Sequence, residues 1–443
     1  MNMDSLENLR NKILNKTAII GVIGLGYVGF PLFLGFGKNN YMTFGFDIDY
    51  KKIDKINSGQ SYINYITSDE IIILLENKNL KATYNFSDIR LCDIIIICVP
   101  TPLTENKEPD ISYILDSANS ISKYLKKGHL IILESTTYPG TTLEEVLPIF
   151  TKGGLRVGKD FYLGFSPERV DPGNKSISIF QIPKIVSGVT DKCLNLVDLL
   201  YKQLFQQTIK VSSPSVAEAA KLLENIYRSV NIALVNEMKI ILDKMDIDIW
   251  EVIEAASTKP FGYTPFYPGP GFGGHCIPID PFYLAWKANR NNTPARFIEL
   301  AGDVNTWMPL YVVEKILLGL KNCNKEIHSS NILLLGVAYK KDIEDTRESP
   351  SLQIMSILKE HGAKVGYNDP YVPYIVSVRK YPNLNIESIP LNHETLRKYD
   401  CVVIVTDHSC YDWEYIVRNS ELIIDTRNAT HQLQNQYHNI IKA

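Results

Sequence analysis

The chain has 443 residues, of which 45% are apolar and 21% are charged, as is typical of a folded globular protein. This length is sufficient for two or three domains with separate cores. The formal net charge of -3 at pH 7 predicts no general attraction to nucleic acid or to an anionic membrane, so local groups must hold any anionic ligand.

The cysteine content indicates a reducing compartment. The count is odd and no CxxC pair occurs, which argues against a disulfide framework; the seven are Cys92, Cys98, Cys193, Cys276, Cys323, Cys401 and Cys410. The segment from Met1 to Lys16 is polar and lacks the apolar core of a signal peptide, so we expect a cytoplasmic protein. Thr17 to Gly37 carries no charge over 21 residues, but its six glycines and Pro31 favour a buried nucleotide-binding unit over a membrane span.

The first half alternates β-rich runs with helical segments. Continuous Ile and Val runs are typical of parallel strands that are buried on both faces. The alternation predicts a doubly wound α/β domain. Its strands are expected at Ala18–Ile23, Met42–Asp47, Asp93–Val99, Leu130–Ser135 and Tyr162–Phe165.

From Ser213 onward the pattern becomes helical. Ala217 to Met245 contains neither Gly nor Pro and predicts one long helix, and helical sequence returns from Phe282 to about Gly319. Between them, Lys259 to Pro281 is rich in Gly, Pro and aromatic residues and predicts a ligand-binding loop.

A second α/β pattern begins at Asn331. Its expected strands are Asn331–Val337, Lys364–Asn368, Cys401–Thr406 and Leu422–Asp425, with a helix at Pro350–His361. We therefore predict two Rossmann-like doubly wound domains joined by a central long-helix domain. The expected boundaries are 1–212 for a dinucleotide-binding domain, 213–319 for a central helical domain and 320–443 for a second α/β domain.

A glycine fingerprint follows the first expected strand. In Gly24-Leu25-Gly26-Tyr27-Val28-Gly29, the glycines suit a tight turn, a close approach to a pyrophosphate and close packing of helix on strand. Asp47 ends the next strand, where a carboxylate accepts from ribose hydroxyls and repels a 2′-phosphate. The pattern favours NAD over NADP, although the positive charge of Lys52 slightly weakens the exclusion of NADP. The alternative is a glycine-rich turn beside a surface aspartate.

Three further strand ends are expected at the edge where such sheets bind ligands. Cys98-Val99-Pro100-Thr101-Pro102 and the run from Glu134 through Ser135 and Thr136 to Gly140 close two strands, although turn chemistry alone also explains their prolines. Glu168 and Arg169 follow a fifth strand, where a solvated ion pair is the alternative.

The long helix and the loop after it carry the remaining central candidates. Lys221 and Asn225 lie four residues apart on one helix face, and an ammonium with an amide could stabilise an oxyanion, although solvent-facing residues explain the same spacing. Cys276 ends the Gly-rich run that includes Gly271 and Gly273, and Asp280 follows near a helix start. Such a position stabilises a thiolate and indicates oxidation through a covalent sulfur adduct.

Basic residues stand at strand ends in the last third. The run from Gly336 to Asp342 includes Tyr339 and Lys340, Arg347 follows shortly after, and Arg427 ends another strand. These side chains could hold phosphates, and a charged surface loop is the alternative.

In this order, the motifs GLGYVG, VPTP, EST, SPER, GFGGHC with Asp280 and GVAYKKDIEDTRES resemble those of the UDP-glucose/GDP-mannose dehydrogenase family. The resemblance spans about residues 17 to 430. It implies two successive hydride transfers from the C6 alcohol of a UDP-sugar to two NAD⁺. The GHCIPIDPFYL form is most similar to the branch that acts on UDP-N-acetylglucosamine or related N-acetylhexosamines.

The resemblance also assigns roles to individual residues. Cys276 would form a thiohemiacetal and then a thioester, with Lys221 and Asn225 stabilising the oxyanions and Glu168, Asp280 and Thr136 handling the hydrolytic water. Cofactor contacts would be Gly24, Gly26, Tyr27, Val28, Gly29, Asp47, Lys52, Pro100, Thr101, Ser135, Thr136 and Arg347. Substrate contacts would be Glu168, Arg169, Val170, Lys221, Asn225, Tyr263, Phe266, Tyr267, Gly271, Gly273, Tyr339, Lys340 and Arg427. No metal is expected.

One departure from the family pattern concerns the segment before the Gly-rich loop. Lys259-Pro260-Phe261-Gly262-Tyr263 has no arginine, whereas the UDP-glucose branch places there an arginine that reaches the partner subunit's substrate. The family also implies a homodimer, or a higher homo-oligomer, built on the long helix. The expected product is a uronic acid precursor of surface polysaccharide.

Three other functions are compatible with the sequence. A sister enzyme would use UDP-glucose or UDP-N-acetylmannosamine. A one-step dehydrogenase of the β-hydroxyacid type would share the domain plan and a lysine, but would need no cysteine. A nucleotide sensor would bind without turnover.

Overall fold

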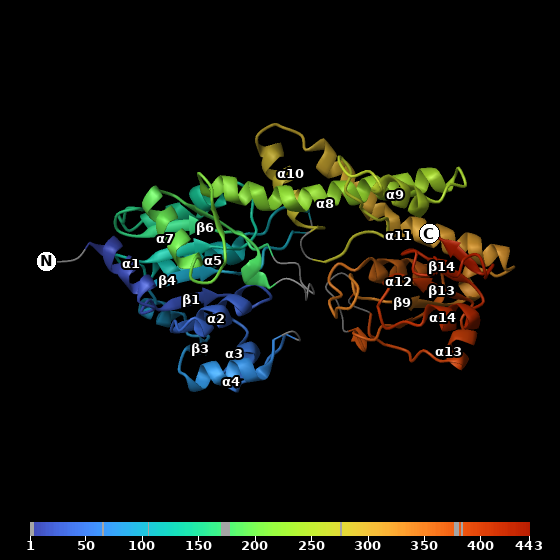
Figure 1. Cartoon of the computed structure of the whole chain (residues 1–443), viewed down its shortest axis with the longest axis horizontal. Helices are drawn as coiled ribbons and strands as arrows, with labels where there is room; N and C mark the ends of the chain where they lie inside the picture. Colours follow the sequence, from blue (N-terminus) through green and yellow to red (C-terminus); the bar gives the residue numbers. More distant parts are fainter. Residues whose placement is uncertain are drawn as a thin grey trace. The chain divides into compact units, whose positions relative to one another are not determined.

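The computed structural model describes residues 4–63, 66–104, 106–169, 178–274, 277–375, 381 and 384–443. The chain forms two compact units. The first comprises Met1–Glu224 with Phe282–Thr293, and the second comprises Asn225–Pro281 with Pro294–Ala443. Helix α8 (Pro214–Asp243) is continuous from the first unit into the second (Figure 1).

The first unit contains an eight-stranded sheet in the order β3-β2-β1-β4-β5-β6-β7-β8. Every neighbouring pair is parallel except β6 and β7, which run antiparallel. The strands are β1 (Ile20–Ile23), β2 (Thr43–Phe46), β3 (Leu80–Thr83), β4 (Ile94–Ile97), β5 (Leu130–Leu133), β6 (Tyr162–Phe165), β7 (Lys184–Gly188) and β8 (Thr208–Lys210). Because the chain leaves β1 first toward β2 and later returns to β4, the topological switch point lies between β1 and β4.

Alternating side chains of the central strands bury both faces of this sheet. Ile94 and Ile96 join one apolar cluster, whereas Ile95 and Ile97 join the cluster on the opposite face. The covering helices are α1 (Ser5–Leu14), α2 (Gly29–Lys38), α3 (Tyr50–Asn57), α4 (Ser68–Glu76), α5 (Ser112–Ser122), α6 (Leu147–Thr151) and α7 (Asp191–Tyr201). Short helical turns are η1 (Phe86–Leu91), η2 (Thr141–Val146) and η3 (Ile179–Gln181).

The second unit contains a five-stranded parallel sheet in the order β10-β9-β13-β14-β15. Its strands are β9 (Asn331–Leu335), β10 (Lys364–Asn368), β13 (Cys401–Ile404), β14 (Ile423–Asp425) and β15 (Ile440–Lys442), and β11 (Tyr374–Ile375) pairs separately with β12 (Ile386–Glu387). Its helices are α9 (Ile249–Ser257), α11 (Arg296–Asn322), α12 (Pro350–Glu360), α13 (His393–Arg397) and α14 (Trp413–Asn419), with the turn η4 (Ile327–Ser329). Leu333 and Leu335 lie in a different apolar cluster from Ile332 and Leu334, so this sheet is also buried on both faces.

The two doubly wound sheets and the long helix confirm the predicted fold class. The helical sequence predicted from Phe282 to about Gly319 forms two helices. Helix α10 (Asp280–Arg290) ends before a turn in which Asn292 has a φ of 54°, and α11 starts at Arg296 after Pro294. The uncharged segment Thr17–Gly37 forms β1 and most of α2. In the part of the chain that the structure describes, no helix is both long and apolar enough to cross a membrane.

Candidate active site

The glycine fingerprint forms the turn between β1 and α2. Gly24 has a φ of 89°, and a Cβ atom there would lie 2.6 Å from the carbonyl oxygen of Cys98, which follows β4. A Cβ at Gly29 would lie 1.9 Å from the oxygen of Gly24, whereas one at Gly26 would meet nothing within 4 Å. Two glycines therefore serve close backbone packing at the switch point, and the third leaves open space above the turn. This arrangement fits the pyrophosphate of a dinucleotide at the start of α2.

Asp47 fixes the same turn from the end of β2. Its Oδ2 accepts from the backbone N of Leu25 at 2.9 Å and its Oδ1 accepts from that of Asp49 at 2.9 Å. Lys52 Nζ also lies 3.5 Å from Oδ2. Since a carboxylate offers about four lone-pair positions, capacity remains for a ribose hydroxyl. The expected NAD-binding residues Gly24, Gly26, Gly29, Asp47 and Lys52 therefore come together, while Tyr27 is exposed and Val28 precedes α2.

The ends of β4 and β5 also lie at this edge of the sheet, because β1, β4 and β5 are parallel neighbours. Ser135 donates its hydroxyl to the carbonyl oxygen of Val99 at 2.8 Å, which ties the two strand ends together. Tyr283 donates to the carbonyl oxygen of Thr101 at 2.8 Å. Pro100 is exposed and Thr136 is half-buried. The cofactor contacts of Pro100, Thr101, Ser135 and Thr136 stay predictions.

Glu168 follows β6 and its carboxylate is held in place. Oε1 accepts from the backbone N of Arg169 at 2.7 Å. Arg169 in turn donates to the oxygen of Pro183 at 2.8 Å and forms an ion pair with Glu224 at 2.6 Å. Val170 lies outside the described residues. The Glu-Arg pair is therefore built into the fold, and is not the solvated ion pair that was the alternative.

Sequence reasoning missed the residue that supports Glu168. Lys184, the first residue of β7, lies 3.5 Å from Glu168 Oε2 and 2.9 Å from Glu134 Oε2. A lysine before an apolar run carries no functional signal by itself. Its role becomes visible only because β7 is antiparallel to β6, so that the start of one strand lies beside the end of the other.

In the second unit, Asn225 meets Asp280. The amide nitrogen of Asn225 on α8 donates to Asp280 Oδ2 at 2.5 Å, and both residues are buried. Arg228 donates to the oxygen of the same amide, which fixes its orientation. One helical turn earlier, Lys221 is also buried, which excludes the solvent-facing alternative for both helix residues. Cys276 lies outside the described residues.

The glycines before Cys276 allow close packing within the protein. A Cβ at Gly273 would lie 2.6 Å from the Cβ of Tyr339, and Gly274 donates its backbone N–H to the oxygen of Arg347 at 2.9 Å. Gly271 has a φ of 117° and lies against the oxygen of Asn305. The loop therefore docks on the segment that carries Tyr339, and direct substrate contact by Gly271 and Gly273 stays a prediction.

The aromatic candidates of this loop have partners in the second unit. Tyr267 stacks on Trp250 with ring centroids 5.6 Å apart, and Phe266 meets Tyr227 edge-on at 5.6 Å. Tyr263 is partly exposed. Loop packing thus accounts for Phe266 and Tyr267, and their contact with a sugar or a base is untested.

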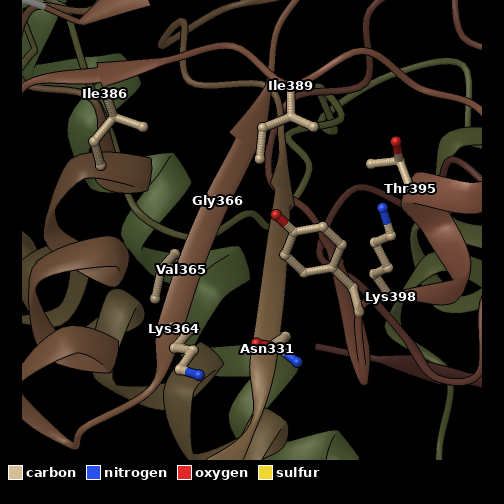
Figure 2. A pocket seen from close by; sticks show the side chains of 9 residues that line it. Asn331, Lys364, Val365, Gly366, Ile386, Ile389, Thr395 and Lys398 are labelled. Carbon is tan, nitrogen blue, oxygen red and sulfur yellow. The ribbon is translucent and has the colours of Figure 1, made fainter.

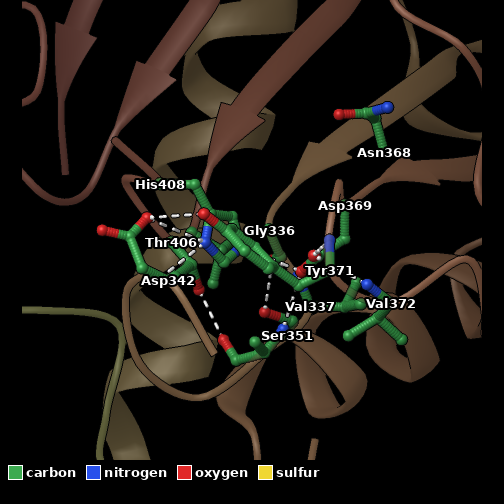
Figure 3. Close-up of polar contacts among 12 residues, drawn as sticks. Gly336, Val337, Asp342, Ser351, Asn368, Asp369, Tyr371, Val372, Thr406 and His408 are labelled. Carbon is green, nitrogen blue, oxygen red and sulfur yellow. Dashed lines mark hydrogen bonds and ion pairs between the residues drawn. The ribbon is translucent and has the colours of Figure 1, made fainter. Parts of the chain in front are cut away.

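A buried aspartate and a buried histidine hold the loop after β9 (Figure 3). Asp369 Oδ2 accepts from the backbone N of Val337 at 2.7 Å and from His408 Nε2 at 3.0 Å, and Oδ1 accepts from the N of Val372 at 3.1 Å. His408 Nδ1 accepts from the backbone N of Asp342 at 3.0 Å. This clamp fixes both ends of the segment that contains Tyr339 and Lys340.

Two arginines of the second unit are held in different ways. Arg347 is exposed, and its Nε donates to Asp345 at 3.0 Å. Arg427 donates from Nε to the oxygen of Val405 at 2.9 Å, and its guanidinium faces Gly269, where a Cβ would lie 2.5 Å from Nη1. Arg427 therefore lies beside the chain segment that leads into the Gly-rich loop.

Two pockets of the second unit differ in how well they are placed for a nucleotide. The larger, of about 570 Å³, is lined by Asn331, Lys364, Val365, Gly366, Ile386, Ile389, Thr395, Lys398 and Tyr399 (Figure 2). It starts at the first residues of β9 and β10, whereas ligands of such sheets bind beyond the carboxyl ends of the strands. The smaller, of about 450 Å³, includes Lys341 and Arg427 and lies at those carboxyl ends. The smaller pocket is the better placed for a nucleotide.

Comparison with known proteins extends over nearly the whole chain. Residues 18–205 match the NAD binding domain of the UDP-glucose/GDP-mannose dehydrogenase family, residues 215–307 match its central domain and residues 333–432 match its UDP binding domain. The UDP-N-acetyl-D-glucosamine 6-dehydrogenase of Pseudomonas aeruginosa is 37% identical over 396 residues, which cover 89% of this chain and 91% of that protein. The UDP-N-acetyl-D-mannosamine dehydrogenase of Pyrococcus horikoshii is 34% identical over 419 residues, covering 92% and 95%.

The solved structures agree with these sequence matches. A UDP-D-ManNAc dehydrogenase from Pyrococcus horikoshii superposes with a TM-score of 0.85 at 32% identity and covers 96% of this chain and 98% of that one. The Staphylococcus aureus enzyme Cap5O, described as a UDP-N-acetyl-mannosamine dehydrogenase, gives a TM-score of 0.80 at 29% identity, covering 96% and 97%.

The fold, the nucleotide-binding turn and these matches define an NAD-dependent oxidoreductase that acts on UDP-sugars. The sequence motifs predicted both properties, and the comparisons confirm them. The chain belongs to the UDP-glucose/GDP-mannose dehydrogenase family.

Proposed function

We propose that this enzyme oxidises the C6 hydroxyl of a UDP-N-acetylhexosamine to a uronic acid, and that UDP-N-acetylglucosamine is its preferred substrate. The observation that carries the choice of sugar is the 37% identity to the UDP-N-acetyl-D-glucosamine 6-dehydrogenase of Pseudomonas aeruginosa over 89% of this chain. The missing arginine before the Gly-rich loop further separates the chain from the UDP-glucose pattern.

Asn225 and Asp280 support the chemistry at C6. A buried amide with its N–H₂ fixed toward a carboxylate can donate its second N–H to an oxyanion, and the buried ammonium of Lys221 supplies positive charge from the same helix face. In the proposal, Cys276 attacks the C6 aldehyde through its thiolate and gives a thiohemiacetal that oxidation converts into a thioester. Bound NAD⁺ supplies the hydride acceptor for both oxidations.

Hydrolysis of the thioester is assigned to Glu168, Asp280 and Thr136. An ionised carboxylate can accept a proton from water, and the backbone N of Arg169 and the ammonium of Lys184 hold the two oxygens of Glu168 in place. Lys340, Tyr339 and Arg427 are proposed to hold the UDP moiety, because the buried clamp of Asp369 and His408 fixes the loop that carries the first two.

UDP-N-acetylmannosamine is the second candidate substrate, favoured by the TM-score of 0.85 to the Pyrococcus horikoshii enzyme. A panel of UDP-N-acetylglucosamine, UDP-N-acetylgalactosamine, UDP-N-acetylmannosamine and UDP-glucose, with NADH counted per sugar consumed, separates the candidates. The proposal expects the highest kcat/KM on UDP-N-acetylglucosamine with two NADH per sugar. One NADH per sugar would instead indicate a one-step dehydrogenase, and binding without turnover on the whole panel would indicate a sensor.

The proposal also covers the domain boundaries, the location, the assembly and the use of the product. The domain boundaries are 1–212, 213–319 and 320–443. The enzyme is cytoplasmic. It forms a homodimer or higher homo-oligomer through α8, because four apolar side chains are exposed on and just after this helix, namely Tyr227, Leu234, Ile241 and Met245. Its product enters the synthesis of a surface polysaccharide.

A further inference from the structure

Three neighbouring strands bring two acids and a lysine together in the first unit. Glu134 follows β5 and Glu168 lies beyond β6, so both stand at the carboxyl edge of the sheet. Lys184 begins β7, and because β7 runs antiparallel to β6, its first residue lies at that same edge. The family motifs quoted above contain neither Lys184 nor a reason for its burial.

Lys184 is almost completely buried. The residue is 2% exposed, and its ammonium lies 2.9 Å from Glu134 Oε2, 3.2 Å from the oxygen of Pro167 and 3.5 Å from Glu168 Oε2. The rings of Tyr201 and Phe205 lie 5.2 Å and 5.3 Å from Nζ. A buried lysine is costly unless paired, so these contacts retain the charge. Although burial alone would lower it, Glu134 and Glu168 raise the pKa of Lys184.

Glu134, which pairs with Lys184, is itself buried and held in place. It is 1% exposed, and Tyr201 donates a hydrogen bond to its Oε1. Burial raises the pKa of Glu134, and Lys184 opposes that effect. The ammonium therefore contacts both Glu134, which Tyr201 holds in place, and Glu168.

Glu168 is the only member of this group that the proposed function uses. Its carboxylate is fixed at Oε1 by the backbone N of Arg169 and at Oε2 by Lys184. These two contacts hold the carboxylate in one orientation. Loss of the contact to Oε2 would let the carboxylate rotate about the bond to its side chain.

We propose that Lys184, anchored by Glu134 and Tyr201, is a positioning residue that aims the Glu168 carboxylate at the water that hydrolyses the thioester. The inference rests on the proposed function, in which Glu168 acts on that water. In this step Glu168 takes one water proton, and the oxygen bonds to the thioester carbon. The C–S bond then breaks, sulfur leaves with the electron pair as thiolate, and the resulting acid releases its proton to solvent.

Lys184→Met tests the proposal in the full-length enzyme. Rapid mixing with NAD⁺ and the best UDP-sugar, followed by acid quench and mass spectrometry, measures how fast the sugar adduct on Cys276 forms and decays. We expect formation to be nearly unchanged and decay to slow by about 100-fold, because a small misplacement of a catalytic group costs about that much. Lys184→Arg, which keeps a buried cation, should recover part of the decay rate.

Ser187→Ala is the matched control. Ser187 lies on the same strand, is equally buried and donates to the oxygen of Phe165 at 2.7 Å, so its loss perturbs β7 without touching Glu168. No adduct should accumulate in this variant. Circular dichroism and NAD affinity report whether each variant is folded. If Lys184→Met does not fold, the paired Glu134→Gln/Lys184→Met variant, which removes both buried charges, replaces it.

Glu168→Gln separates the two proposals. If that variant accumulates no adduct and still forms acid, the role of Glu168 in the proposed function is wrong. If Glu168→Gln accumulates adduct but Lys184→Met hydrolyses it at the wild-type rate, the positioning role is wrong. In the Glu168→Gln/Lys184→Met double variant, the adduct should decay no more slowly than in Glu168→Gln alone. If the two single effects on the decay rate instead multiply, the inference is overturned.

Discussion

The side-chain amide of Asn225 donates to Asp280 at 2.5 Å while its oxygen accepts from Arg228, so this amide has one fixed orientation in a buried site. Asn225→Asp would place two carboxylates at hydrogen-bond distance, where they cannot both remain ionised. We expect kcat to fall at least 100-fold at pH 7 to 8, as on loss of an oxyanion donor. Steady-state kinetics across pH checks this, with the exposed Asn119→Asp on α5 as a control. An unchanged kcat would remove Asn225 from the mechanism.

Replacement of the thiol tests covalent catalysis. Cys276→Ser should abolish production of the uronic acid, because a serine hydroxyl is a far weaker nucleophile than a thiolate, while NAD affinity stays within about twofold. NADH yield per sugar and calorimetric titration with NAD measure the two properties. The exposed Cys410→Ser is the control for loss of a thiol elsewhere. Full acid production by Cys276→Ser would falsify the covalent mechanism.

The carboxylate of Asp47 should decide between the two nicotinamide dinucleotides. Asp47→Asn keeps a side-chain oxygen for the backbone N of Leu25 but removes the negative charge. We expect KM for NAD to rise about 10-fold or more, since a hydrogen bond to a charged group contributes about 1.5 to 3 kcal/mol. NADP should be used relatively better, because Lys52 is released from its ion pair. The ratio of kcat/KM values for NAD and NADP measures both effects, and an unchanged ratio would contradict the assignment.

The clamp between Asp369 and His408 should control UDP binding without affecting NAD. His408→Leu removes the donor to Asp369 and the acceptor for the backbone N of Asp342, so the loop with Lys340 loses its fixed position. We expect UDP affinity to fall about 10-fold or more while NAD affinity is retained. Titration calorimetry with each nucleotide separates the two. Equal losses for both nucleotides would indicate general destabilisation.

The pH dependence of the same clamp follows from Asp369. Although burial opposes the effect, hydrogen bonds from His408 and from the backbone lower the pKa of Asp369 below its ordinary value of 3.8. Its contribution to stability is therefore present above about pH 4 and is lost as the pH falls through the lowered pKa. Chemical unfolding of wild type and Asp369→Asn from pH 7 to pH 3 should show curves that converge at the acidic end.

Acid should also destabilise the protein through His129. This residue is buried beside β5, and burial lowers its pKa from 6.5 to about 4. The unfolded chain binds a proton in that window and the native state does not, so stability rises with pH between about 4 and 6.5. The shift corresponds to roughly 3 kcal/mol at most. His129→Gln should flatten that part of the stability curve, and an identical slope would refute the account.

Much of the fold could be predicted because local patterns carry it. The Ile run of β4, the glycine turn before α2 and the long helix without Gly or Pro each identify their element. The short strands β3, β7, β8 and β15 were missed, since three to five residues of mixed polarity give no periodic signal. The break between α10 and α11 depends on the turn at Asn292. The sequence on both sides of this turn is typical of a helix, so the turn was not predicted.

The sequence by itself determined the cofactor class and the class of reaction, because both reside in short motifs whose spacing fixes what a backbone turn or a helix face can present. Only the tertiary structure decided which groups support those motifs. Lys184 reaches Glu168 from 16 residues along the chain, and His408 reaches Asp369 from 39, through strand neighbours that no local pattern specifies. The physical reason is that burial and pairing of a charge depend on strand order and direction, which are properties of the whole sheet.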